Sequence, residues 1–116
     1  MNIPNKLYHK SPISLRKIIS NNGLIVQIGY SYKSHWDGTK LENKLKPLVF
    51  LYDKDIQVYD TTYDDDIWEV DMTQLSKKYC IKDIDKYMAK NGCFAYTKDI
   101  PSNVIKLIHK GSGKSL

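Results

Sequence analysis

The spacing of apolar residues changes from a strand period to a helix period within the first twenty residues. Leu7-Tyr8-His9 is typical of the end of a short strand, and apolar residues then recur at helical spacing from Leu15 to Ile19. Between the two, Ser11 offers an N-cap oxygen and Pro12 suits the first helical position. Gly23 predicts the end of the helix, because glycine readily adopts the positive φ of a C-cap.

The remaining apolar runs predict further strands and a second helix. Strands are predicted at 24–28, 48–52, 56–59, 67–71, 93–97 and 104–108, and a helix at 83–91. Because helices do not alternate regularly with strands, a doubly wound parallel sheet is disfavoured. We expect an α+β fold, with a small mixed or antiparallel split sheet and two helices. One domain would span residues 1–110, and residues 111–116 would form a flexible tail.

Composition is ordinary for a globular domain. The chain has 116 residues, 41% hydrophobic and 27% charged, which suits a single core. No apolar run approaches the roughly 20 residues that span a bilayer, and the N-terminus lacks a signal-peptide core. We therefore expect a cytoplasmic protein without membrane contact. Abundant Lys, Asn, Ile and Tyr suit an AT-rich genome, and so a small bacterial or phage protein.

The net charge of +5 raises the question of an acidic partner or nucleic acid. Arg16 is the sole arginine, whereas bidentate recognition of phosphates and bases usually relies on arginine. Solvation of the surface explains the scattered lysines better than a nucleic-acid site does. Nucleic-acid binding is therefore less favoured than either of the two functions considered below. Cys80 and Cys93 match no zinc or redox spacing and are expected to act as small apolar residues.

Carboxylates offer candidate chemistry in two places. Glu69 and Asp71 share one face of the strand at 67–71, and paired carboxylates perform acid–base catalysis when their environments differ. The alternative is the wet face of a half-exposed strand. Asp64-Asp65-Asp66 is expected to be a solvated acidic turn rather than a cation site. No metal site is expected, because the three histidines are not paired at ligand spacing.

A polar stretch from 29 to 46 carries aromatic and hydroxyl side chains. Tyr30, Tyr32 and Trp36 would make good contact anchors for a protein partner. The alternative is a loop with no binding role. The first interpretation supports a non-enzymatic interaction protein, such as a phage-encoded inhibitor of a host or defence factor.

The order of motifs resembles the ADP-ribosyltransferase fold in its compact bacterial and phage versions. The similarity rests on five short segments. Residues 7–12 resemble the first-strand signature LYH-x-[ST], and residues 15–24 resemble the helix that follows it. Residues 47–51 resemble the second-motif strand, residues 67–71 resemble the "LEVD" strand, and residues 99–105 resemble the closing "IPP-x-x-I". Together these segments cover most of the chain between Leu7 and Ile108.

The resemblance implies NAD as cofactor, bound in a cleft of the split sheet. His9 would contact the nicotinamide-side ribose or the amide, with Ser11 beside it and Tyr52 against the ring. Transfer also needs an acid next to the developing positive charge on the ribose. Residues 91–98, where the family commonly keeps this acid, contain no Asp or Glu, which leaves Glu69 as the candidate. The protein would either modify a protein or nucleic acid, or bind without transferring.

Overall fold

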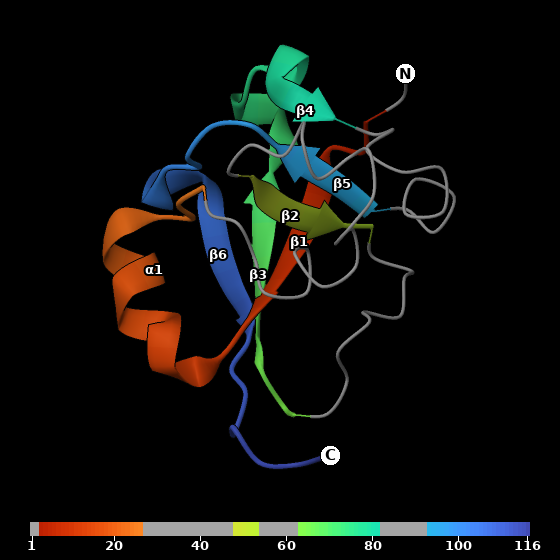
Figure 1. The fold of residues 1–116 in the computed structure, drawn as a ribbon. Coiled ribbons are helices and arrows are strands. Elements are labelled where there is room, and N and C mark those ends of the chain that lie inside the picture. Colours follow the sequence, from red (N-terminus) through yellow and green to blue (C-terminus); the bar gives the residue numbers. More distant parts are fainter. Residues whose placement is uncertain (1–2, 27–47, 54–62, 82–92) are drawn as a thin grey trace, which may run out of the picture.

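The computed structural model describes residues 3–26, 48–53, 63–81 and 93–116. Its strands are β1 (Lys6–Ser11), β2 (Val49–Tyr52), β3 (Asp66–Asp71), β4 (Cys80–Ile81), β5 (Cys93–Tyr96) and β6 (Ile105–His109), and its α-helix is α1 (Arg16–Asn22). Short 3₁₀ turns lie at Ile13–Leu15, Met72–Gln74, Lys77–Tyr79 and Ser102–Val104. The described strands form one antiparallel sheet in the order β4-β5-β2-β1-β3-β6 (Figure 1). The expected α+β class with an antiparallel sheet is confirmed. The expected helix at 83–91 and strand at 56–59 lie outside the described residues.

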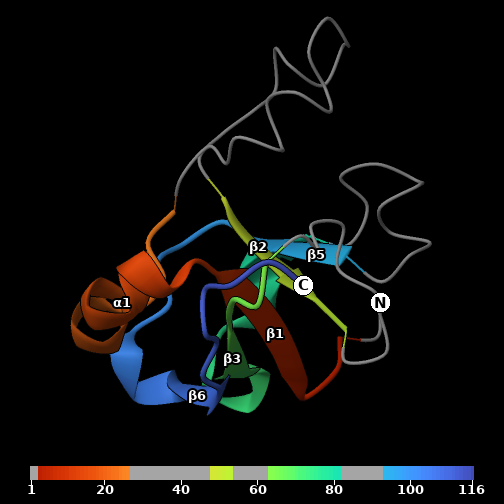
Figure 2. The same cartoon turned by 90° about the horizontal axis from the view of Figure 1, so that it is seen from below.

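The sheet has two parts that meet between β1 and β2. Strand β1 pairs with β3 over six residues, whereas its register with β2 is the single pair Tyr8 and Tyr52. In Figure 1 the strands β1, β3 and β6 run together, and β2 and β5 cross their direction. Figures 1 and 2 both place α1 beside the part that contains β1, β3 and β6.

Alternation along the strands sorts side chains onto two faces of the sheet. Leu7 and His9 pair in register with Val70 and Trp68, and this face is the core. The opposite face carries Tyr8 and its register partners. The core residues beyond these strands include Ile19, Leu24, Met72, Ile100 and Val104. The face on which a residue lies therefore decides which candidates can share a site.

Ser11 is not the helix N-cap. It is the last residue of β1, and it is only 2% exposed because the strand alternation turns it onto the core face. Its hydroxyl accepts a hydrogen bond from Trp68 Nε1 at 3.1 Å. The chain then enters a 3₁₀ turn after Pro12, with no side-chain cap, and α1 begins at Arg16. The N-cap prediction is wrong because Ser11 still belongs to β1, where its side chain lies on the core face, and α1 starts only at Arg16.

Gly23 ends α1 as predicted. Its φ is 78° and its ψ is −165°, a region that is essentially restricted to glycine. Its N–H donates to the carbonyl of Ile19 at 2.8 Å. A Cβ at this position would lie 2.0 Å from the Ile100 carbonyl oxygen, because Leu24 and Ile100 exchange two backbone hydrogen bonds. The glycine thus allows the chain leaving α1 to run against the segment before β6.

The chain after β6 lies along the entry to β3. Gly111 is buried, and its N–H donates to Asp66 Oδ1 at 2.9 Å. The Ser112 N–H donates to Asp64 Oδ2 at 3.0 Å, and Tyr63 and Ser115 form an isolated bridge. Residues 111–115 therefore have a hydrogen-bonded place where a flexible tail was expected.

None of the helices in the described ranges is long and apolar enough to cross a bilayer.

Candidate ligand pocket at His9

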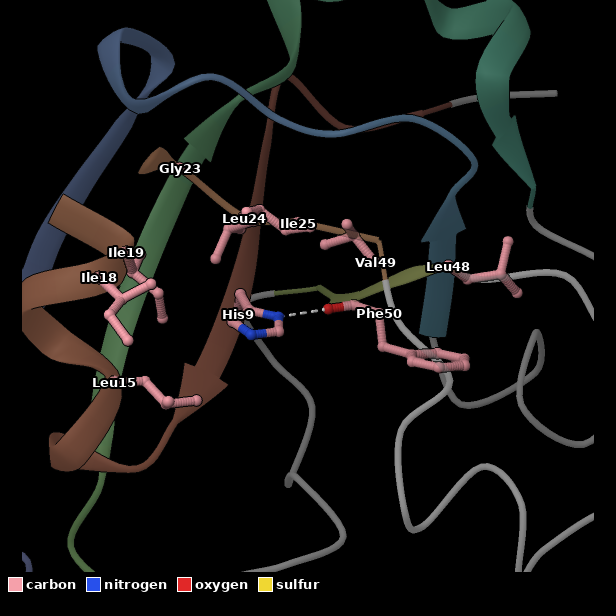
Figure 3. A pocket seen from close by; sticks show the side chains of 10 residues that line it. All are labelled: His9, Leu15, Ile18, Ile19, Gly23, Leu24, Ile25, Leu48, Val49 and Phe50. Carbon is pink, nitrogen blue, oxygen red and sulfur yellow. Dashed lines mark hydrogen bonds between the residues drawn. The ribbon is translucent and has the colours of Figure 1, made fainter. Parts of the chain in front are cut away.

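A pocket of about 240 Å³ opens between β1, α1 and β2 (Figure 3). Its lining residues are His9, Leu15, Ile18, Ile19, Gly23, Leu24, Ile25, Leu48, Val49 and Phe50. Every lining side chain other than His9 that the structure describes is apolar. The pocket thus has the composition of many small-molecule sites, in which apolar walls surround few polar groups.

His9 is held in one orientation by the neighbouring strand. Its Nδ1 lies 2.7 Å from the Phe50 carbonyl oxygen, which Figure 3 shows as a dashed line. A carbonyl only accepts, so Nδ1 carries the proton and donates, and Nε2 is left as an acceptor. Burial among aliphatic side chains lowers the pKa of His9, and the hydrogen bond to Phe50 offsets this only in part. The ring is therefore neutral at physiological pH, and its Nε2 makes no hydrogen bond to the described residues.

The helix wall is more exposed than its spacing predicts. Ile19 is 6% exposed and belongs to the core, but Ile18 is 53% exposed at the pocket. Ile25 on the following segment is 51% exposed. Ile18 thus shares the helical spacing of Leu15 and Ile19 but is not part of the core. Apolar surface around a concave site is surface that a ligand could cover.

Two predicted cofactor contacts do not join His9. Ser11 does not line the pocket, because its hydroxyl is sealed against Trp68. Tyr52 lies on the opposite face, where its ring centroid is 6.1 Å from that of Tyr8. The Tyr52 hydroxyl is buried and has no hydrogen-bond partner in the part of the chain that the structure describes. Burial and the neighbouring Tyr8 raise the pKa of Tyr52 to about 12.

The candidate acid, Glu69, also lies on the opposite face from His9. It is in register with Tyr8, whereas His9 is in register with Trp68. A Glu69 carboxylate oxygen lies 3.3 Å from Lys6 Nζ in a partly exposed ion pair. Of the described residues that line the pocket, none carries a carboxylate. The sheet itself therefore separates the predicted ligand residue from the predicted acid.

Asp71 makes its hydrogen bonds to the turn that follows β3. Its carboxylate accepts from the Thr73 N–H and hydroxyl and from Gln74 Nε2, which caps the 3₁₀ turn at 72–74. These hydrogen bonds lower the pKa of Asp71. The geometry favours the alternative interpretation, in which the two carboxylates stand on the wet face of the strand.

The fully buried carboxylate of Asp66 pairs with Arg16. Arg16 Nε and one of its terminal nitrogens donate to the two Asp66 oxygens at 2.8 and 2.7 Å. The same terminal nitrogen donates to the Gly111 carbonyl at 3.0 Å. The hydrogen bonds from Arg16 lower the pKa of Asp66, and the same carboxylate raises the pKa of Arg16. The sole arginine is thus committed to the fold, which weakens the case for nucleic-acid recognition.

The predicted solvated turn at 64–66 is wrong for Asp66, which is 0% exposed. The alternation of residues 67–71 could have predicted this burial. Extended by one residue, it places Asp66 on the same face as Trp68, which is the core face. Asp64 is partly exposed and bonds His109 Nε2 at 2.7 Å. That bond and those from Ser112 lower the pKa of Asp64 to about 2.

The predicted partner anchors Tyr30, Tyr32 and Trp36 lie outside the described residues. Ile25 and Leu48, which lie before and after this segment in the sequence, line the pocket.

The described cysteines are free thiols, with Cys80 buried and Cys93 partly buried. Burial raises the pKa of both, to about 11 for Cys80. In the same ranges, no three His, Cys, Asp or Glu side chains gather as a metal site would require.

Comparisons with known protein families, with curated proteins and with solved structures find no match.

Proposed function

We propose that this protein is an ADP-ribosyltransferase-like domain that binds NAD at the His9 pocket and does not transfer ADP-ribose. The observation that carries the proposal is a neutral histidine whose free Nε2 borders an apolar pocket with no carboxylate among its described lining residues. The LYH-x-[ST] resemblance supports the same location, because it assigns His9 to the NAD cleft.

The binding half of the proposal follows from the pocket walls. Leu15, Ile19 and Val49 offer aliphatic surface on which the flat face of a nicotinamide ring can pack. His9 supplies one directional contact among these walls. The charged remainder of the dinucleotide would stay outside the apolar space, because burying an unpaired diphosphate would cost far more than the ring gains.

The non-catalytic half follows from the position of Glu69. Departure of nicotinamide leaves positive charge on the ribose, and an enzyme accelerates that step by placing negative charge beside it. Glu69 is on the opposite sheet face and is paired with Lys6. Among the described residues, the pocket therefore offers contacts for a bound ring and no carboxylate for transfer.

Thermal unfolding with and without NAD tests the binding half. NAD at 100 times its Kd should add about 2.7 kcal/mol to the free energy of unfolding. His9→Phe keeps an aromatic ring but removes the acceptor, and it should abolish most of the shift. An unchanged melting temperature at saturating NAD would refute the proposal.

Incubation with labelled NAD and a host lysate tests the non-catalytic half. We expect no labelled protein or nucleic acid above a boiled control. Label transfer that is lost in Glu69→Gln would overturn this half and restore Glu69 as the acid.

A further inference from the structure

We infer that the His9 pocket selects a ring that carries an uncharged hydrogen-bond donor, a carboxamide or a hydroxyl, and rejects the matching carboxylate. The inference rests on the proposed function, since it names the ligand chemistry of the same pocket. It depends on three features: the tautomer of His9, the walls around it and the size of the space.

The tautomer fixes what His9 can recognise. The Phe50 carbonyl holds the proton on Nδ1, so Nε2 presents a lone pair. A lone pair accepts from the N–H of an amide or from the O–H of an alcohol. A carboxylate offers only acceptors, so its oxygens and Nε2 would repel each other. A neutral histidine in this orientation thus distinguishes two ligands of nearly equal shape.

The walls increase this distinction. The other described lining side chains are apolar, so a carboxylate entering the pocket would lose its hydration without gaining a cation. Arg16 is close in sequence to the wall residue Leu15, but its guanidinium already binds Asp66 and the Gly111 carbonyl. An uncharged donor loses less hydration and recovers a hydrogen bond at Nε2.

The size of the pocket limits the ligand to one ring. An apolar cavity of about 150 Å³ is large enough to hold benzene, and sites for drug-sized molecules begin at about 300 Å³. At about 240 Å³, the pocket suits a six-membered ring with one small substituent. Only one end of a dinucleotide would therefore enter it.

Acid should reverse the preference, because a protonated His9 donates from Nε2. His9 is the single titratable residue among the described lining. Three charged groups on the adjoining elements have other partners: Arg16 binds Asp66, Asp99 accepts from the Val26 N–H, and Lys10 lies 4.0 Å from Asp65. Lys17 on α1 is exposed and does not line the pocket. Asp53 follows β2, beyond the lining residues. The burial that lowers the pKa of His9 places the reversal on the acid side of neutrality.

The decisive experiment compares benzamide with benzoate by calorimetry on the full chain, near neutral pH. Because an unmade buried hydrogen bond weakens binding markedly, we expect benzamide to bind at least about tenfold more tightly. Benzyl alcohol in a third arm separates the amide from the hydroxyl as the preferred donor. The ratio of benzamide to benzoate affinity should fall when the pH is lowered from about 8 to about 5.

Two variants separate the acceptor from the walls. His9→Phe should bring the two affinities together, whereas Leu15→Ala should weaken both and keep their ratio. If His9→Phe fails to fold, the comparison in the unaltered protein and its pH dependence still decide the matter. Equal affinities, tighter benzoate binding near neutral pH, or no binding of any probe would overturn the inference.

The outcome for NAD is separate. Stabilisation by NAD with equal benzamide and benzoate affinities would leave the proposed function standing and end this inference. Selective benzamide binding without any stabilisation by NAD would refute the proposed NAD binding and leave this inference standing.

Discussion

Two polar clusters stand on the core face near the end of β1, and they differ in how fully their hydrogen bonds are made. In one, Asp66 accepts from Arg16 and from the Gly111 N–H. In the other, His9 donates from Nδ1 to Phe50, and its Nε2 has no partner among the described residues. The chain thus completes one cluster by itself and leaves an acceptor open in the other.

This difference indicates that the Asp66 cluster stabilises the fold, whereas His9 is available to bind a ligand. A buried polar group that has all its partners holds elements together, and Asp66 connects the start of β3 to α1 and to the chain after β6. An open acceptor beside an apolar pocket adds little to the fold, but it gives direction to a molecule that enters. Mutations should therefore affect stability in the first cluster and ligand binding in the second.

Asp66→Asn should have the largest effect on stability. Removing one partner of a buried ion pair leaves Arg16 uncompensated, which costs about 3–5 kcal/mol when both groups are buried. The Arg16 side chain is 27% exposed, so we expect about 3 kcal/mol, the lower end of that range. Urea unfolding of both proteins measures the difference. A loss below about 0.5 kcal/mol, the scale of ordinary surface substitutions, would remove the structural role of this pair.

The acid dependence of the same variant gives an independent check. Arg16 lowers the pKa of Asp66, so the stability from this carboxylate is complete above the unfolded pKa of about 4. That stability is lost as the pH falls through the lower folded value. Asp66→Asn should therefore show a shallower loss of stability below about pH 4 than the unaltered protein. Parallel pH profiles would contradict this account.

Ser11→Ala should have an intermediate effect. It leaves the buried Trp68 Nε1 without its acceptor, at a cost of about 1–3 kcal/mol in unfolding free energy. Ser20→Ala is the matched control, since Ser20 is exposed on α1 and should change stability by less than about 0.5 kcal/mol. Neither serine lines the pocket, so benzamide affinity should not change. A loss of affinity in Ser11→Ala alone would return Ser11 to the binding site.

Local pattern predicted most of the described strands and α1. The strand expected at 24–28 is, in its described residues, only an isolated bridge between Leu24 and Ile100. Alternation identified β3, and Asn21-Asn22-Gly23 marked the end of α1. The pattern failed at Ser11 and Asp66, because the partners that decide their environments are distant in sequence. Ser11 meets Trp68 across the sheet, and Asp66 meets Arg16 from α1. Hydrogen bonds across such separations depend on pairing register, which no local window contains.

The candidate site was predictable at one residue only. The resemblance assigns His9 to a ligand cleft, and His9 does line a pocket. The same resemblance groups Tyr52 and Glu69 with His9, whereas the register of β1 with β2 and β3 places both on the other face. The Phe50 carbonyl, which fixes the tautomer, is a backbone group and leaves no mark in a side-chain pattern.

Glu69→Gln should have the smallest effect, and it tests the division between the two sheet faces. Its partner Lys6 has a 59% exposed side chain, and such surface pairs contribute about 0–1 kcal/mol. Because the substitution acts on the face opposite His9, the affinities for benzamide and NAD should equal those of the unaltered protein within error. Calorimetry and urea unfolding on one preparation measure both quantities. A large loss of NAD affinity with unchanged stability would mean that Glu69 contacts the ligand. The conclusion that the sheet separates Glu69 from the ligand at His9 would then be wrong.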